Sequence, residues 1–236
     1  MVTLPASQAP VLSVLLFTPN DPAALDIIRA ALRRQTIANQ LELVVVVQSA
    51  AAFGDVSSLF AGFAGGRVIE LDGVYLLGRA KAAAVLAATS PIVVLAEDHC
   101  FPEPHWAEKL VAAFSEGPHA AVGPAVRIGN SGEGLGSATH YMHWGAWTEP
   151  RRGNAAMIAP HNGAYRRSVL LERAGRLPDL FPTEQFLQAE LLDNGHTLFV
   201  EPAAVVSHYG ISRFLPWVGL GFWGGRLFGG NRAAHE

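Results

Sequence analysis

The sequence predicts an α/β fold with a mostly parallel central sheet and helices on both of its faces. Over the first half of the 236 residues, short continuous apolar runs alternate with helical patterns. Continuous apolar strands are typical of a sheet that is covered on both faces, and the strand–helix alternation is typical of parallel pairing. Half of the residues are hydrophobic and 16% are charged, which indicates a globular chain with a sizeable core.

Five strands are expected in the first half, at apolar runs that are continuous rather than alternating. They cover residues 11–17, 41–47, 68–71, 92–96 and 120–126. Helices are expected between them, at residues 22–34, 76–89 and 104–114. Asp21 is predicted to cap the first helix and Pro22 to occupy its first position, because these residue types are favoured there.

The second half of the chain is less regular. Two helical patterns, residues 166–174 and 185–194, each end at a glycine, which is a common helix stop. Two late strands are expected at residues 197–200 and 203–207.

Charge and cysteine content exclude several classes of protein. The formal net charge is −3 and no long basic run is present, so no nucleic-acid partner is expected. The single cysteine, Cys100, excludes an internal disulfide framework and fits a reducing compartment, so a cytoplasmic location is expected. No repeat, low-complexity segment or linker divides the chain, and a single domain over residues 1–236 is therefore predicted.

The C-terminal tail is unusually apolar. Residues 214–223 are rich in aromatic side chains but are interrupted by Gly and Pro, and Arg226 and Arg232 follow. These interruptions argue against a transmembrane helix. Three interpretations stay open: packing against the domain, peripheral contact with a membrane, and a clipped membrane-associated extension.

Three polar side chains follow the predicted strand 92–96. They are Glu97, Asp98 and His99. Ligands of parallel α/β sheets bind beyond the carboxyl ends of the strands, and oxygen donors suit Mg²⁺ or Mn²⁺, which usually share their coordination with substrate phosphates. The tripeptide is therefore a candidate metal site, and a solvated acidic turn is the alternative.

Other segments carry weaker signals. Arg79 and Lys81 lie at the start of an expected helix, where phosphate could bind, but cationic side chains there are often only solvated. His208 ends a late apolar run and is either structural or a ligand. Thr183 and Glu184 open a helix, for which capping is a sufficient explanation. The chain has no P-loop and no dinucleotide-binding fingerprint.

Five segments together carry a resemblance to a known family. They are Phe17-Thr18-Pro19-Asn20, Gly78-Arg79-Ala80-Lys81, Ala96-Glu97-Asp98-His99, Asn162-Gly163-Ala164-Tyr165 and the stretch from Thr183-Glu184 to Gly195. Their order and spacing between Val11 and Tyr209 resemble the family 2 glycosyltransferases of the GT-A fold. The resemblance implies one GT-A domain, with a nucleotide-sugar-binding half at residues 10–105, an acceptor and catalytic half at 106–210, and the apolar tail at 211–236.

The resemblance also implies a divalent metal, Mn²⁺ or Mg²⁺, bound by an E-D-H variant of the family's DxD motif. Asp98 matches the final, metal-holding aspartate, whereas Ala96 stands where the first aspartate is usual. Glu97, His99 and His208 are the expected additional ligands.

Roles for the remaining segments follow from the same resemblance. Glu184 matches the general base, in place of the family's aspartate. The expected nucleotide-sugar contacts are Thr18, Pro19, Asn20, Gln48, Arg79 and Lys81, and the expected acceptor-side residues are Asn162, Gly163 and Trp144. Gln48 departs from the family, whose second strand normally ends on Asp.

The implied reaction is a metal-dependent, inverting sugar transfer from a nucleotide-diphosphate sugar to a hydroxyl group of a glycan or lipid-linked acceptor. The departures at Ala96 and Gln48 keep an alternative open, a non-catalytic GT-A-like module for nucleotide binding or assembly. A nucleotidyltransferase would normally have a Gly-rich, basic first turn, which the segment after Phe17 lacks.

Overall fold

The computed structural model describes residues 2–4, 9–18, 21–72, 77–130, 134–210 and 214–235. Two of the residues expected to contact the nucleotide-sugar, Pro19 and Asn20, lie outside these ranges.

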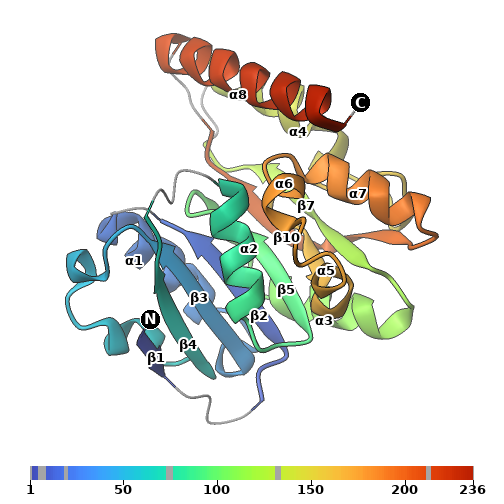
Figure 1. The fold of residues 1–236 in the computed structure, drawn as a ribbon. Coiled ribbons are helices and arrows are strands. Elements are labelled where there is room, and N and C mark those ends of the chain that lie inside the picture. Colours follow the sequence, from blue (N-terminus) through green and yellow to red (C-terminus); the bar gives the residue numbers. More distant parts are fainter. Residues whose placement is uncertain are drawn as a thin grey trace.

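In the described part of the chain, ten strands form one twisted sheet (Figure 1). The strands are β1 (Val2–Leu4), β2 (Leu12–Phe17), β3 (Leu41–Val47), β4 (Gly65–Glu70), β5 (Ile92–Ala96), β6 (Cys100–Pro102), β7 (Ala121–Ile128), β8 (Gly153–Ala155), β9 (Ala164–Arg166) and β10 (Leu198–His208). Their order is β1-β4-β3-β2-β5-β9-β7-β10-β6, and β8 pairs with β10.

The long strands all run in one direction. Strands β4, β3, β2 and β5 pair in parallel, as do β7 and β10. Each antiparallel pair involves one of the three-residue strands, β1, β6, β8 or β9. The predicted mostly parallel sheet is confirmed, and the carboxyl ends of its long strands lie along one edge.

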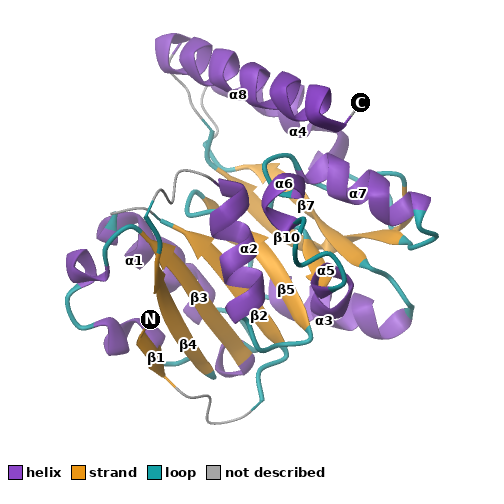
Figure 2. Ribbon diagram, viewed as in Figure 1, coloured by secondary structure: helices purple, strands orange, loops and turns teal. Residues whose placement is uncertain are grey.

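Helices cover both faces of this sheet (Figure 2). The helices of the described residues are α1 (Pro22–Arg33), α2 (Leu77–Ala87), α3 (Trp106–Glu116), α4 (Leu135–Thr148), α5 (Arg167–Leu171), α6 (Leu177–Leu180), α7 (Glu184–Asp193) and α8 (Phe214–His235), with short 3₁₀ turns η1 (Ala38–Gln40), η2 (Ala50–Phe53) and η3 (Val56–Phe60). Helices α1 and α3 pack on one face, and α2, α5, α6 and α7 on the other.

Strand β3 shows why the apolar runs are continuous. Leu43 and Val45 belong to the core under α1 and α3, whereas Val44 and Val46 belong to the core under α2 and α6. Because successive side chains of a strand point to opposite faces, burial on both faces requires an apolar residue at every position.

The residues predicted to start α1 and to stop α7 lie at those helix ends. The Asp21 carboxylate accepts a hydrogen bond from the Ala24 backbone N–H at 3.0 Å, and Pro22 is the first residue of α1. Gly195 follows the end of α7 with a φ of 80°, a left-handed conformation that glycine adopts without steric cost.

Several segments differ from the sequence-based expectation. The helix expected at residues 166–174 is the shorter α5, and α4 was not expected. The two late strands are one strand, β10, whose pairing with β7 shifts register between Glu201 and Val205, next to Pro202. The tail, interrupted by Gly and Pro, forms helix α8; its Pro216 lies in the first turn, where the missing N–H costs no helical hydrogen bond. Among the helices of the described residues, none has the length and apolar character that crossing a bilayer requires.

Candidate functional site

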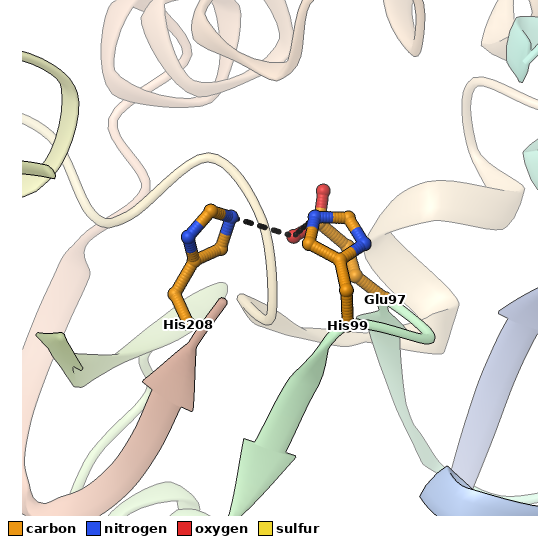
Figure 3. Close-up of side chains that lie close together, drawn as sticks. All are labelled: Glu97, His99 and His208. Carbon is orange, nitrogen blue, oxygen red and sulfur yellow. Dashed lines mark ion pairs between the residues drawn. The ribbon is translucent and has the colours of Figure 1, made fainter. Parts of the chain in front are cut away.

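Three of the predicted metal ligands converge beyond the carboxyl ends of the sheet (Figure 3). Glu97 follows β5, His99 precedes β6 and His208 ends β10. Nε2 of His99 lies 3.4 Å and Nε2 of His208 lies 3.7 Å from Oε2 of Glu97. The antiparallel pairing of β6 with β10 places Cys100 opposite His208, and this register brings the His99 and His208 rings to a centroid distance of 4.9 Å.

Asp98 is not one of the three converging side chains but contacts one of them. Its Oδ1 atom is 3.0 Å from Nδ1 of His99, the ring nitrogen that does not face Glu97. A carboxylate on the second nitrogen of a histidine is the usual partner that orients a metal-binding imidazole. The structure thus places Asp98, expected as the principal metal ligand, where it contacts a candidate ligand.

A residue that the sequence analysis missed, His161, completes the cluster. Its Nδ1 atom lies 3.3 Å from Oε1 of Glu97 and 3.7 Å from Oε1 of Glu184. The available signal was its position directly before Asn162-Gly163, the segment that the resemblance assigned to the acceptor side.

The segment that carries His161 is fixed to the end of β5. The backbone N–H of Asn162 donates to the carbonyl of Leu95 at 2.8 Å, and the N–H of Leu95 donates to the carbonyl of Gly163 at 3.2 Å. Asn162 has a φ of 59°, in the left-handed region that Asn tolerates better than most residues. Two predicted acceptor-side residues, Asn162 and Gly163, are therefore buried beside the cluster.

The ionisation of the cluster follows from burial and mutual charge. Burial opposes the charged form of Glu97. The electrostatic effect of the neighbouring imidazoles, largest for His161 and then for His99 and His208, outweighs burial, so the pKa of Glu97 lies below its usual range. Burial lowers the pKa of His208 to about 4, so this imidazole is neutral at pH 7. For His99, burial is outweighed by the hydrogen bond with Asp98 and the charge of Glu97, and its pKa is raised.

The donor set fits a divalent transition metal. One carboxylate and two imidazoles offer ligand atoms that lie within 4.8 Å of one another. Oε2 of Glu97 is buried and, among the described residues, receives no hydrogen bond, so it has acceptor capacity to give to an ion. Imidazole is an ordinary ligand of transition metals, whereas Mg²⁺ prefers oxygen, so the set favours Mn²⁺ over Mg²⁺.

Glu184 and Lys81 form a second buried group. Glu184 begins α7 and Lys81 lies in α2; their side chains are 2% and 5% exposed, and Nζ of Lys81 contacts Oε1 of Glu184. The same ammonium donates to the carbonyl of Phe181 at 3.3 Å. The residue expected to bind nucleotide, Lys81, is therefore paired with the expected general base.

The close approach of α2 to α6 depends on Gly78. A Cβ atom at this position would lie 2.1 Å from the carbonyl oxygen of Pro178 and 2.9 Å from the ring of Pro182. Glycine thus lets the two helices pack closely enough for Lys81 to reach Glu184.

The other predicted residues lie around the same edge of the sheet. Thr18 follows β2; it is fully buried, and its hydroxyl has no hydrogen-bond partner among the described residues. Gln48 follows β3 and is exposed, as is Arg79 in the first turn of α2. Trp144 of α4 is buried, with its ring 4.8 Å from that of His208 and 5.6 Å from that of His161.

Comparison with solved structures agrees with this architecture. The crystal structure of S. aureus TarS 1-349 matches with a TM-score of 0.62 and 13% identity, over 84% of this chain and 60% of that one. GalNAc-T7, solved with UDP, GalNAc and Mn²⁺, matches with a TM-score of 0.64 and 15% identity, over 85% of this chain and 43% of that one. At this identity the likeness shows a shared GT-A fold, and the present chain spans 60% or less of either protein.

Comparison of the sequence with known proteins and families gives a second, independent result. No curated protein matches it. The family model described as glycosyl transferase family 2 matches residues 13–173, which include all but the first residue of β2, strands β3 to β9, and Glu97, His99 and His161. On this match over more than half of its length, the chain belongs to glycosyl transferase family 2.

Proposed function

We propose that this protein transfers a sugar from a nucleotide-diphosphate sugar to a hydroxyl acceptor, with inversion at the anomeric carbon and with a bound divalent metal. The observation that carries the proposal is the convergence of Glu97, His99 and His208 at the carboxyl ends of β5 and β10, in a chain of this family. Nucleotide-sugar ligands need charge compensation at the diphosphate, and this position is where parallel α/β sheets bind ligands. The similar GalNAc-T7 structure contains UDP, GalNAc and Mn²⁺.

Glu97, His99 and His208 would hold the metal, and Asp98 would act through His99. When bound, a divalent ion neutralises the negative charge that the departing diphosphate carries. The low pKa of His208 favours this role, because a metal binds the neutral imidazole and competes with few protons at pH 7.

The donor would lie across the strand ends from β3 to β5. Thr18 offers a buried hydroxyl that has no hydrogen-bond partner in the described part of the chain, Gln48 an exposed amide and Arg79 an exposed guanidinium for phosphate. Pro19 and Asn20 belong to the same proposed contact through their place in the sequence, between Thr18 and α1.

Glu184 would remove the proton from the acceptor hydroxyl as it attacks the anomeric carbon in line with the departing diphosphate, a contribution of roughly 10²–10⁴-fold. Lys81 fixes the position of its carboxylate. The acceptor would reach Glu184 past His161, whose side chain is one third exposed and contacts Oε1 of Glu184. Trp144, Asn162 and Gly163 would line that approach.

The test is a thermal-shift panel of nucleotide diphosphates and their sugars, with and without Mn²⁺. A metal-dependent shift for one nucleotide is expected, and the matching sugar nucleotide then serves as donor in a transfer assay. Glu184→Gln should abolish transfer and leave nucleotide binding nearly intact. Full activity of Glu184→Gln would refute the assignment of the base.

Two observations favour a second candidate, a non-catalytic nucleotide-binding or assembly module. Glu184 is buried in an ion pair with Lys81, and Ala96 replaces the first acidic residue of the metal motif. A protein that binds nucleotide diphosphate with Mn²⁺ but neither transfers nor hydrolyses its sugar would support this candidate. Metal-dependent turnover would exclude it.

The acceptor class is proposed from helix α8. Its side chains Phe214, Leu215, Phe222 and Trp223 are 62–79% exposed, and Arg226 lies over the ring of Trp223 at 5.2 Å. Aromatic side chains with nearby cations suit the interface of an anionic membrane, where a lipid-linked acceptor would be found. Co-sedimentation with vesicles tests this, and the protein is expected to bind anionic but not neutral vesicles. A protein that binds neither kind of vesicle would favour a glycan as the acceptor instead. The cytoplasmic location expected from the single cysteine also stays a prediction.

A further inference from the structure

We propose that His161 is a positioning residue that connects the metal site to Glu184 by holding the Glu97 carboxylate in place. The inference rests on the proposed metal site and adds a residue that the metal motif does not contain. Nδ1 of His161 lies between two carboxylates, 3.3 Å from Oε1 of Glu97 and 3.7 Å from Oε1 of Glu184.

The contact uses the oxygen of Glu97 that the other two imidazoles leave free. His99 and His208 both face Oε2, whereas His161 faces Oε1. A carboxylate that is contacted on one oxygen cannot rotate freely, so Oε2 stays directed at His99 and His208. Partners of this kind orient metal-binding side chains and contribute to metal affinity without touching the ion.

The position of His161 is itself fixed. The next residue, Asn162, is 2% exposed and is bonded through its N–H to Leu95 at the end of β5. The imidazole also packs edge-to-face with the ring of Trp144 at a centroid distance of 5.6 Å. Backbone and ring contacts therefore fix the position of Nδ1 of His161 relative to Glu97, the first residue after β5.

His161 also completes a chain of polar contacts through the interior. Lys81 contacts Glu184, Glu184 contacts His161 and His161 contacts Glu97. This chain links α2 and α7 with the end of β5 through one side chain, that of His161.

Binding of Mn²⁺ alone, followed by the electron paramagnetic resonance signal of free Mn²⁺, tests the proposal without a donor or an activity assay. His161→Ala should weaken Mn²⁺ binding about 10–100-fold, the usual effect of removing a residue that orients a ligand. His161→Asn should restore affinity to within a few-fold of wild type, because its amide nitrogen is as many bonds from Cα as Nδ1. His161→Gln, whose nitrogen corresponds to Nε2, should not.

Control variants keep these outcomes distinct. His143→Ala, on the exposed side of α4, should bind Mn²⁺ as the wild type does, and circular dichroism in EDTA checks folding of each variant. Unchanged affinity of His161→Ala, or rescue by Gln instead of Asn, would overturn the role of His161 while leaving the metal site in place. No Mn²⁺ binding by the wild type would overturn both.

Discussion

Lys81 and Glu184, which lie 103 residues apart in the sequence, form a buried ion pair that joins α2 to α7. A helix from the first half of the chain thereby fixes the position of Glu184, the proposed general base, in the second half. Buried pairs of this kind contribute little net stability over an apolar pair, but a lone buried charge is costly.

Lys81→Met should therefore lower the free energy of unfolding by about 3–5 kcal/mol, because the Glu184 carboxylate stays buried without its partner. Urea denaturation measures the loss. The double variant Lys81→Met/Glu184→Gln, which removes both charges, should recover most of it. A double variant whose loss equals the sum of the two single losses would show that the pair is not coupled.

Gly78→Ala should destabilise the protein by about 1–3 kcal/mol, because the added Cβ would overlap the carbonyl oxygen of Pro178. The same change should weaken the contact of Lys81 with Glu184 by moving α2 away from α6. Gly175→Ala is the matched control, since no atom lies within 4 Å of its added Cβ. Equal thermal midpoints of the two variants would contradict the packing argument.

Asp98→Asn should weaken Mn²⁺ binding about 10–100-fold, because Asp98 contacts His99 and acts on the metal through it. Glu97→Gln should remove binding, since it deletes the only carboxylate of the converging group among the described residues. Titration of each variant with Mn²⁺ compares them directly. Loss of binding in Asp98→Asn as complete as in Glu97→Gln would make Asp98 a direct ligand.

The Cys100 thiol should be unreactive in the folded protein. Burial first, and then the charge of Glu97, raise its pKa well above the ordinary value of 9.0, so the thiolate that reacts with disulfide reagents is scarce. At pH 8, DTNB should label the protein only after unfolding in urea. Rapid labelling of the native protein would contradict the buried placement.

The same shift gives a pH dependence of stability. A raised pKa in the folded state means that the unfolded chain releases the thiol proton first, so the stabilising effect is complete below pH 9 and decreases above it. Cys100→Ala should show a shallower loss of stability above pH 9 than the wild type in urea denaturation. Identical slopes would exclude a contribution from Cys100.

The sheet could be predicted from the sequence because its signals are local. Residues 41–47 and 92–96 are apolar at every position, and the structure assigns both as strands, β3 and β5, with the same bounds. Asp21 and Pro22 likewise mark the start of α1 by the chemistry of those two residues alone. Helix α8 and the continuity of β10 past Pro202 were not predicted, because glycine and proline there interrupt the local pattern.

The site was predictable only where chemistry coincides with a strand end. Glu97 was a candidate because it follows an apolar run, and all long parallel strands end at one edge of the sheet, whereas the choice of His208 as a ligand needed the family resemblance. His161 and the pairing of Lys81 with Glu184 were not predicted, since no local pattern specifies which loops and helices meet.

The sequence by itself therefore determined the layers, the order of the main elements and the strand ends that carry polar groups. Only the tertiary structure decided that His161 lies between Glu97 and Glu184, that Lys81 is buried against Glu184 and that Asp98 contacts His99. The physical reason is the range of the interactions in sequence. Burial of a strand or helix face and helix capping depend on neighbouring residues, so they produce a local pattern in the sequence. A contact between β5, α2 and α7 depends on the packing of the whole sheet and produces no such pattern.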